Sequence, residues 1–252
     1  MAERWQPDRS RGVFETLLVV EGKPVELEAH LHRLAQSLDA VYSRPLPPQA
    51  GDEMRRAAEG IPLGRLRLSV APTEDGLRID LLAGGVDPEA VFPSLGMKLR
   101  THAVAGGLGP HKWAHRPGIN RPAPDQAGAL IVDEGEVLEA GWANVFAVRG
   151  GTLFTPPLDG RLLTGTTRAA LLQLAVEEGI ESEEGPLSPA DLLTADEVFL
   201  TGSIRGIEAA LELDAQPLAG CGEISDRLGG ALKRHWNLRT PAVAPKADQL
   251  FR

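Results

Sequence analysis

Segments with the composition of β-strands recur along almost the whole chain, and most of them end at a short turn containing glycine. Residues 13–20 are rich in β-branched side chains, and the chain turns at residues 21–24 before residues 25–27 resume the strand pattern. Strands joined by short turns pair as antiparallel hairpins. The same pattern recurs at residues 66–70, 77–82, 97–104, 129–133, 136–140, 144–148, 153–155 and 197–201. Antiparallel sheet is therefore predicted to be the main element of the fold.

A few segments have the period of a helix instead. In residues 28–41, leucine and valine recur at intervals of three and four, which places them on one face of a helix. Residues 168–178 and 224–236 show further helical patterns, and residues 53–59 and 188–191 begin short helices. Strands and helices in this mixture predict an α+β protein.

The segment Ala105–Pro110 has four glycine or proline residues in six and is the most flexible composition in the chain. We take it as the boundary between a small domain, residues 1–108, and a larger one, residues 109–252. With 252 residues and 42% hydrophobic side chains, the chain has enough material for a proper core. Clefts between domains are preferred ligand sites, so residues just after this boundary are well placed for chemistry.

Charge and cysteine usage exclude several kinds of partner. A formal net charge of −9 argues against nucleic acid or an anionic membrane as the main partner. No run of about 18 apolar residues and no signal-peptide core occurs, so we expect a cytoplasmic protein. The single cysteine, Cys221, excludes an intrachain disulfide and a multi-cysteine metal site.

Lys112 and Glu139 are the candidate catalytic pair. Lys112 follows the glycine-rich boundary, and Glu139 lies within a strand-like segment. A lysine amine that forms a Schiff base, with a carboxylate that keeps a pyridine nitrogen protonated, is what a pyridoxal phosphate enzyme needs. Most lysine and glutamate residues are solvated surface charges, and that alternative stays open on spacing alone.

Two further segments have the features of anion sites. Gly165 is followed by Thr166 and Thr167 at the start of a helix, where free N–H groups, hydroxyls and the helix dipole come together. The strand at residues 197–201 ends in the small residues of 202–207, which can also meet a phosphate. A plain threonine N-cap and an ordinary turn are the alternatives. Arg33, beside the apolar stripe of the first helix, has a surface role as its alternative.

Taken in order, several motifs over most of the chain resemble the class IV aminotransferases, the fold type IV pyridoxal phosphate enzymes. They are Gly12–Thr16, His30–Leu34, His111-Lys112, Glu139–Phe146, and the stretch from Leu153–Pro157 to Leu163–Arg168. The resemblance implies a two-domain fold, with a small N-terminal α/β sandwich and a larger C-terminal β-barrel-like domain carrying helices. It also implies pyridoxal 5'-phosphate as the cofactor and an active site between the domains.

Site roles follow from the same resemblance. Lys112 would attach the cofactor and Glu139 would pair with its ring nitrogen. The phosphate would be bound by Arg33, by Thr166 with the amides beside Gly165, and by Ser203. Leu163 would pack against the ring, and Asn144 would hydrogen-bond near the cofactor. No metal is expected.

Within the family, residues 112–116 and 201–207 resemble 4-amino-4-deoxychorismate lyases. Branched-chain aminotransferases usually have a tyrosine shortly after the lysine, whereas the only tyrosine here is Tyr42. Two segments depart from the lyase pattern. Residues 116–126 are rich in proline, and Glu208-Ala209-Ala210 replaces the usual proline-valine.

The expected function is therefore conversion of 4-amino-4-deoxychorismate to 4-aminobenzoate and pyruvate, with Arg205 and Arg116 as substrate contacts. A helix-end or surface role is the alternative for Arg205. An amino-acid aminotransferase of branched-chain or D-amino-acid type is the alternative enzyme, and a non-catalytic binding protein is the alternative of another class. The expected partners are a carboxylated amine substrate and, by the resemblance, a second copy of the chain in a homodimer.

Overall fold

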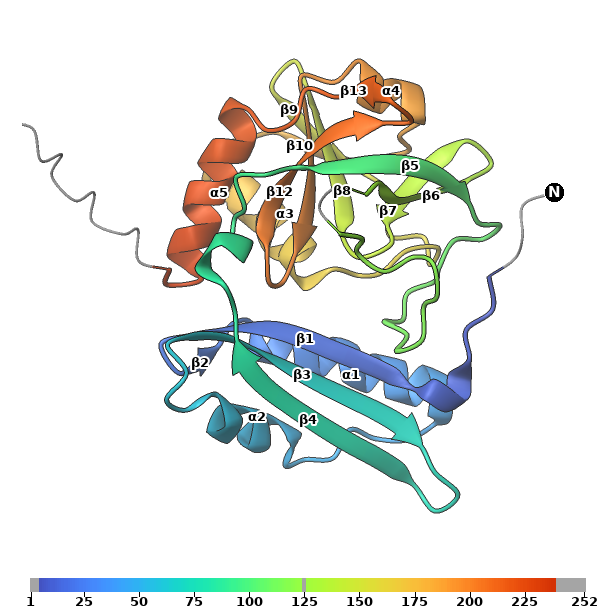
Figure 1. Ribbon diagram of the computed structural model, residues 1–252, viewed down its shortest axis with the longest axis vertical. Helices are drawn as coiled ribbons and strands as arrows, with labels where there is room; N and C mark the ends of the chain where they lie inside the picture. Colours follow the sequence, from blue (N-terminus) through green and yellow to red (C-terminus); the bar gives the residue numbers. More distant parts are fainter. Residues whose placement is uncertain (1–4, 124–125, 239–252) are drawn as a thin grey trace, which may run out of the picture.

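The strands of the protein form two separate sheets in a computed structural model that describes residues 5–123 and 126–238 (Figure 1). One sheet has four strands and the other has nine. Five α-helices lie among them in the described residues, so the predicted α+β class is confirmed. Residues 239–252 of the second predicted domain lie outside this description.

The four-stranded sheet is built from the first third of the chain. Its order is β2-β1-β3-β4, with antiparallel pairing throughout. The strands are β1 (Val13–Val20), β2 (Lys23–Pro24), β3 (Leu63–Pro72) and β4 (Leu77–Gly85). Helices α1 (Leu27–Tyr42) and α2 (Ala50–Ala58) pack against one face of this sheet through a shared apolar core, as Figure 1 shows.

The prediction that a strand resumes at residues 25–27 is wrong. Glu26 has a positive φ of 52°, and the chain turns there directly into α1, which begins at Leu27. The short β2 is all that remains of the second arm of the predicted hairpin. A left-handed turn at a glutamate has no strong sequence signal, because this conformation is uncommon outside glycine, asparagine and aspartate.

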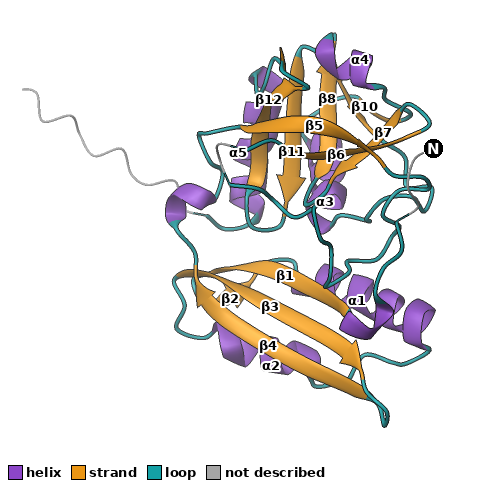
Figure 2. Cartoon of the chain, turned by 45° about the vertical axis from the view of Figure 1, so that its right-hand side comes forward, coloured by secondary structure: helices purple, strands orange, loops and turns teal. Residues whose placement is uncertain are grey.

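The nine-stranded sheet follows the order β10-β9-β8-β11-β12-β5-β6-β7, with β13 paired to β12. Figure 2 shows β5 running across β8 and β11, so the sheet curls over itself. A tight turn joins β7 to β8, and in it the Ala140 N–H donates to the Ala143 carbonyl at 2.9 Å. The strands are β5 (Met97–Ala103), β6 (Gly128–Asp133), β7 (Glu136–Ala140), β8 (Asn144–Arg149), β9 (Thr152–Thr155), β10 (Ser182–Glu184), β11 (Glu197–Gly202), β12 (Gly206–Leu213) and β13 (Gln216–Pro217).

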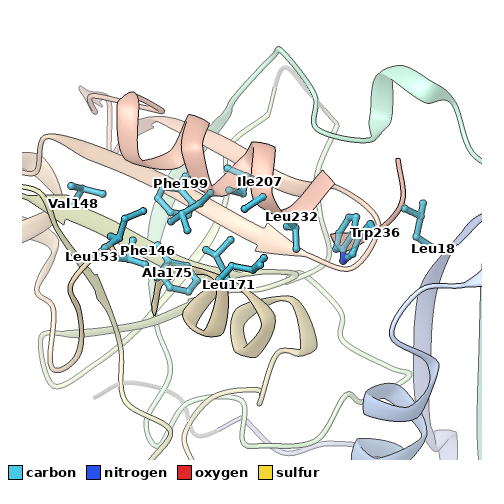
Figure 3. Close-up of a cluster of buried hydrophobic side chains, with 14 of the residues drawn as sticks. Leu18, Phe146, Val148, Leu153, Leu171, Ala175, Phe199, Ile207, Leu232 and Trp236 are labelled. Carbon is cyan, nitrogen blue, oxygen red and sulfur yellow. The ribbon is translucent and has the colours of Figure 1, made fainter. Parts of the chain in front are cut away.

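The core of the larger sheet is continuous with β1 of the smaller one. Phe146 and Phe199 stack at its centre, with ring centroids 5.4 Å apart and an interplanar angle of 5°. Helices α3 (Thr166–Glu177) and α5 (Glu223–His235) cover this core, and α4 (Pro189–Leu193) lies beyond it. Leu18 of β1 reaches the same cluster near Trp236, as Figure 3 shows. The two sheets therefore share buried apolar contacts.

The chain passes between the sheets after β4 and before β5, not at the predicted boundary of residues 108 and 109. Although β5 was assigned to the first domain, it pairs in parallel with β12 and β6 of the larger sheet. The strand β12 was not predicted; only its first two residues fell in the segment 202–207, which was interpreted as a turn. Both features depend on pairing between segments far apart in sequence, which a local pattern does not report. The division into two domains stays a prediction.

The five helices of the described residues do not include one with the length and apolar character needed to cross a bilayer.

Candidate active site

Lys112 is held at the end of β1 by backbone hydrogen bonds. The Phe14 N–H donates to the Lys112 carbonyl at 2.9 Å, and the Ala114 N–H donates to the Gly12 carbonyl at 3.0 Å. In the glycine-rich loop before Lys112, Gly107 packs closely against Arg161: its φ is +66°, and an added Cβ would lie 2.1 Å from the Arg161 carbonyl oxygen. The segment that begins in the larger sheet is therefore attached to the smaller one.

The Lys112 side chain lies in a cationic environment. Its Nζ lies 5.1 Å from the centre of the Phe14 ring. Burial lowers the pKa of Lys112 to about 7, and the positive charges of Arg116 and Arg33 act in the same direction. Glu15 and Glu139 oppose the shift without cancelling it. A lysine with this pKa supplies a neutral, nucleophilic amine near neutral pH.

Glu139 lies on β7 and is only 4% exposed. Burial raises its pKa to about 7, although a hydrogen bond from the Leu163 N–H and the charge of Arg116 lower it. The Leu163 nitrogen is 3.3 Å from Oε1 of Glu139. A carboxylate with so little solvent gains stability from a nearby cation, and a protonated ring nitrogen would provide one.

A small recess of about 40 Å³ adjoins Lys112 at the start of α3. Its wall includes Gly165, Thr166 and Thr167, as the sequence predicts for an anion site. An added Cβ at Gly165 would lie 1.9 Å from Oδ1 of Asn144, so this position admits only glycine without movement. The first-turn N–H groups of α3 have no acceptor within their own helix, so they are available to an anion in the recess.

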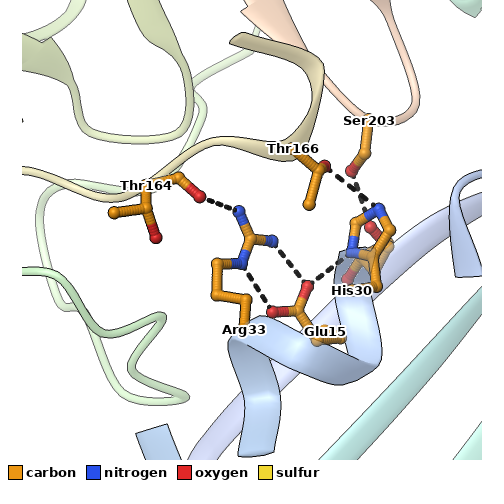
Figure 4. A network of polar contacts seen from close by, with 7 residues as sticks. Glu15, His30, Arg33, Thr164, Thr166 and Ser203 are labelled. Atoms are coloured by element: carbon orange, nitrogen blue, oxygen red, sulfur yellow. Dashed lines mark hydrogen bonds and ion pairs between the residues drawn. The ribbon is translucent and has the colours of Figure 1, made fainter. Parts of the chain in front are cut away.

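Arg33 faces the recess, and a network of polar contacts with β1, α1 and the loop before α3 fixes its position (Figure 4). Its Nε and Nη2 donate to the two oxygens of Glu15 at 2.8 and 2.6 Å, and Nη1 donates to the Thr164 carbonyl at 2.8 Å. His30 Nδ1 lies 2.7 Å from the same carboxylate, and His30 Nε2 lies 3.2 Å from the Thr166 hydroxyl. These bonds leave one N–H on each terminal nitrogen of Arg33 for a ligand.

Glu15 is ionised in this network. Burial alone would raise its pKa, but the Arg33 charge and the hydrogen bonds from His30 and Arg33 lower it to about 2. Glu15 and His30 were predicted only as parts of a strand and a helix. Neither had a signal of its own, because their role is visible only once β1 and α1 are packed together.

Ser203, Asn144 and Leu163 also line the recess. The Ser203 hydroxyl donates to the Thr16 carbonyl at 2.6 Å, so in this arrangement it has no proton to offer an anion. Asn144 Nδ2 donates to the Leu163 carbonyl at 3.0 Å and so orders the loop that contacts Glu139. The predicted phosphate role of Ser203 requires its hydroxyl to rotate.

A larger cavity of about 550 Å³ continues from the recess, and Lys112, Trp142 and Ser203 line both. Arg116 and Arg205, predicted as substrate contacts, are in its wall. Sequence reasoning missed three further arginines that line it: Arg65, Arg67 and Arg121. The guanidinium of Arg67 lies over the Phe14 ring at 3.7 Å, and that of Arg116 lies 5.4 Å from the same ring centre.

The residues present fit pyridoxal phosphate. Among the described side chains, the buried hydroxyls of Thr167 and Thr201 and the buried Nε1 of Trp142 have no hydrogen-bond partner, and all three residues line the recess. Unpaired buried polar atoms are costly, so a polar ligand that satisfies them is favoured. Thr201 had no individual signal in the sequence. The site roles of all these residues stay predictions, although the structure brings them together.

Residues 121–212 match the family model described as amino-transferase class IV. The branched-chain-amino-acid aminotransferase of Escherichia coli is 37% identical over 105 residues, which are 41% of this chain and 34% of that protein. The match therefore spans about a third of the length of that curated relative.

Two solved structures resemble nearly the whole chain. The 4-amino-4-deoxychorismate lyase from Pseudomonas aeruginosa is 27% identical with a TM-score of 0.70, covering 93% of this chain and 96% of that chain. A hypothetical aminotransferase from Mycobacterium tuberculosis in its PLP-bound form is 23% identical with a TM-score of 0.76, covering 91% of this chain and 89% of that chain. At 23% identity, the similarity to the Mycobacterium tuberculosis protein shows a shared fold. The predicted family resemblance and fold are confirmed.

Proposed function

We propose that this protein is a pyridoxal phosphate lyase, because residues 121–212 match the class IV aminotransferase family model and nearly the whole chain resembles a lyase of known structure. Its proposed reaction converts 4-amino-4-deoxychorismate to 4-aminobenzoate and pyruvate. The 4-amino-4-deoxychorismate lyase of known structure from Pseudomonas aeruginosa resembles 93% of this chain. A homodimer and a cytoplasmic location remain parts of the proposal.

The single observation that carries the substrate class is the charge of the larger cavity. Five arginines and Lys112 line it, whereas its acidic residues are Asp87 and Glu208. Cations in excess favour an anionic ligand, and guanidinium groups suit carboxylates in particular. The proposed substrate has two carboxylates, which agrees with this excess. The arginines of the cavity are Arg65, Arg67, Arg116, Arg121 and Arg205.

The recess and the cavity divide the work between them. Arg33, Thr166 and the first-turn N–H groups of α3 would hold the cofactor phosphate in the recess. Lys112 Nζ would attach the cofactor aldehyde carbon. Glu139 would hold a proton at the ring nitrogen. When bound, pyridoxal phosphate supplies an electron sink that stabilises negative charge at the substrate carbon next to the nitrogen.

With the cofactor bound, the Nζ of Lys112 would accept the proton from the substrate carbon that carries the amine. The pKa of about 7 suits this general-base role near neutral pH. Loss of that proton would allow the bond between the neighbouring ring carbon and the enolpyruvyl oxygen to break, and a proton added to the released group would give pyruvate. The ring becomes aromatic, so atoms and electrons balance without an oxidant.

The test is an assay of purified protein with 4-amino-4-deoxychorismate, read by formation of 4-aminobenzoate and pyruvate in equal amounts. Lys112→Ala should abolish both products and also the visible absorbance that borohydride reduces. Lys98→Ala, on the surface beside Glu212, is the matched control and should keep both. Product release by Lys112→Ala equal to that of the parent would exclude the proposed role of Lys112.

An aminotransferase is the second candidate, and the 37% identity to the Escherichia coli enzyme over 105 residues favours it. Both reactions use the same lysine, carboxylate and phosphate positions and differ at the cavity wall. Incubation with pairs of amino acids and 2-oxoacids separates them, because transfer of the amino group consumes both partners. Transfer without release of 4-aminobenzoate would replace the lyase proposal by this one. A protein that takes up no pyridoxal phosphate would support the non-catalytic alternative.

A further inference from the structure

Glu208 of β12 joins two arginines that line the larger cavity. Its Oε1 accepts a hydrogen bond from Nη2 of Arg121 at 2.7 Å and lies 3.3 Å from Nη1 of Arg205. The Glu208 side chain is 2% exposed, whereas those of Arg121 and Arg205 are 24% and 25% exposed. The carboxylate is therefore buried behind two guanidinium groups that retain contact with the cavity.

The charges of this cluster do not cancel. One carboxylate faces two guanidinium groups, which leaves one net positive charge at the cavity wall. Nε of Arg121 is also buried without a hydrogen-bond partner among the described residues. An unpaired buried donor and an excess cation both favour an anion, and a single carboxylate would satisfy the charge.

The cluster is separate in its contacts from the other arginines of the cavity. Arg67 and Arg116 lie against the Phe14 ring, and Arg116 Nη1 donates to the Gly141 carbonyl at 2.7 Å. Arg121 and Arg205 instead share Glu208. The cavity thus has two distinct pairs of arginines, which is the arrangement expected for a ligand with two carboxylates.

Both segments of the cluster are places where the sequence departs from the pattern it resembles. Arg121 lies in the proline-rich segment 116–126, and Glu208 begins the Glu208–Ala210 replacement. The two residues are 87 positions apart and meet at 2.7 Å. The departures are therefore parts of one structural unit.

We infer that Arg121 and Arg205 bind one carboxylate of a dicarboxylate substrate, and that Glu208 is a positioning residue that sets the orientation of both guanidinium groups. This inference deepens the proposed function and rests on the cavity beside Lys112 being its substrate site. The second carboxylate is left to the arginine pair at Phe14. Monocarboxylates lose one of these two attachments and bind more weakly.

The binding of two aromatic acids tests the inference independently of catalysis. Isophthalate carries two carboxylates on one ring and benzoate carries one, and calorimetry on the full-length purified protein measures the affinity of each. The parent protein should bind isophthalate at least 10-fold more tightly than benzoate. Arg121→Ala should lower the affinity for isophthalate by about 10- to 100-fold, the loss expected for a charge-assisted contact. It should change the affinity for benzoate by less than about threefold.

Arg121→Lys and Arg78→Ala complete the set of variants. Arg121→Lys keeps the charge but loses the planar fork, so it should recover only part of the isophthalate affinity and controls for folding of the alanine variant. Arg78 pairs with Asp80 on the exposed edge strand β4, and Arg78→Ala should leave both affinities at parental values. Equal isophthalate binding by the parent, Arg121→Ala and Arg121→Lys would overturn the inference.

The positioning role of Glu208 has its own readout. Glu208→Gln should lower the affinity for isophthalate in the parent protein. It should have little effect on that affinity when Arg121 is already alanine, because the two changes act on one contact. If Glu208→Gln and Arg121→Ala instead weakened the binding of both acids additively, Glu208 would have a purely structural role, and this part of the inference would be overturned. A parent protein that has lyase activity but binds isophthalate no more tightly than benzoate refutes the inference alone. An intact, Arg121-dependent preference without lyase activity refutes only the proposed reaction.

Discussion

The carboxylate of Glu15 accepts hydrogen bonds from Nε and Nη2 of Arg33 at 2.8 and 2.6 Å, so the arginine that faces the recess at the start of α3 is held by a buried acid from β1. The pair connects the smaller sheet to the site at the start of α3, because Arg33 also donates to the Thr164 carbonyl. The position of the Arg33 guanidinium beside the recess thus depends on contacts between three segments of the chain.

Glu15→Gln should destabilise the protein and weaken its affinity for pyridoxal phosphate. The change leaves Arg33 buried without its counter-charge, and removal of one partner of a buried ion pair typically costs about 3–5 kcal/mol. Urea unfolding of the cofactor-free protein and titration with pyridoxal phosphate measure the two effects. Glu28→Gln, an exposed acid that pairs with Arg55, is the control and should change the free energy of unfolding by less than about 1 kcal/mol. Equal stability of the two variants would contradict the role of the pair.

The same carboxylate should make the protein sensitive to acid. The pKa of Glu15 is lowered from 4.5 to about 2, so the folded state favours the ionised form. The resulting stability is fully present above pH 4.5 and is lost as the pH falls from there toward 2. Unfolding measured between pH 6 and pH 3 should show this loss in the parent and a shallower slope in Glu15→Gln. Identical slopes would count against an ionised Glu15.

Reaction of the cofactor-free protein with pyridoxal phosphate should accelerate as the pH rises through about 7. The neutral amine of Lys112 is the reactive form, and its pKa of about 7 sets the midpoint. Arg116→Gln removes a positive charge that lowers this pKa, so the midpoint should move to higher pH. Stopped-flow absorbance over a pH series follows both proteins. An unchanged midpoint would show that Arg116 does not act on the lysine charge.

Gly165→Ala should prevent the cofactor recess from keeping its shape. The new Cβ would lie 1.9 Å from Oδ1 of Asn144, whereas the φ of −65° at this position imposes no backbone strain. The expected result is a loss of pyridoxal phosphate affinity of 10-fold or more. Asn144→Ala in the same chain should restore part of the affinity by making room, and Gly76→Ala, with open space around it, is the control. Absence of any rescue would place the cause elsewhere.

Thr201→Val should separate cofactor affinity from stability. The Thr201 hydroxyl is buried without a partner among the described residues, so its removal should leave the cofactor-free protein equally or more stable. If the hydroxyl binds the cofactor, affinity for pyridoxal phosphate should fall by about 10-fold. Thermal unfolding with and without the cofactor measures both quantities. A loss of stability in both states would indicate a structural role instead.

Strand β1 and helix α1 could be predicted from the sequence because their signals are local. The β-branched run at residues 13–20 and the leucine spacing of residues 28–41 each report the period of their own element. Lys112, Glu139 and Thr166 could be selected because residue type and local context suggested their chemistry. The resemblance then indicated that these positions form one site. Local pattern could not show that Lys112 and Thr166 line one recess, or that Glu139 accepts a hydrogen bond from Leu163 in the wall of that recess.

Only tertiary structure decided which elements pair and which charges meet. The chain order does not reveal that β5 lies between β12 and β6, because those pairings are set by the curl of the larger sheet. It does not reveal that Glu15 neutralises Arg33 or that Glu208 joins Arg121 to Arg205. Buried charges are tolerated only where the fold supplies a partner, and the partners here come from distant segments. The sequence by itself determined the elements and the chemical groups, whereas packing of the two sheets determined the charge and geometry of the site.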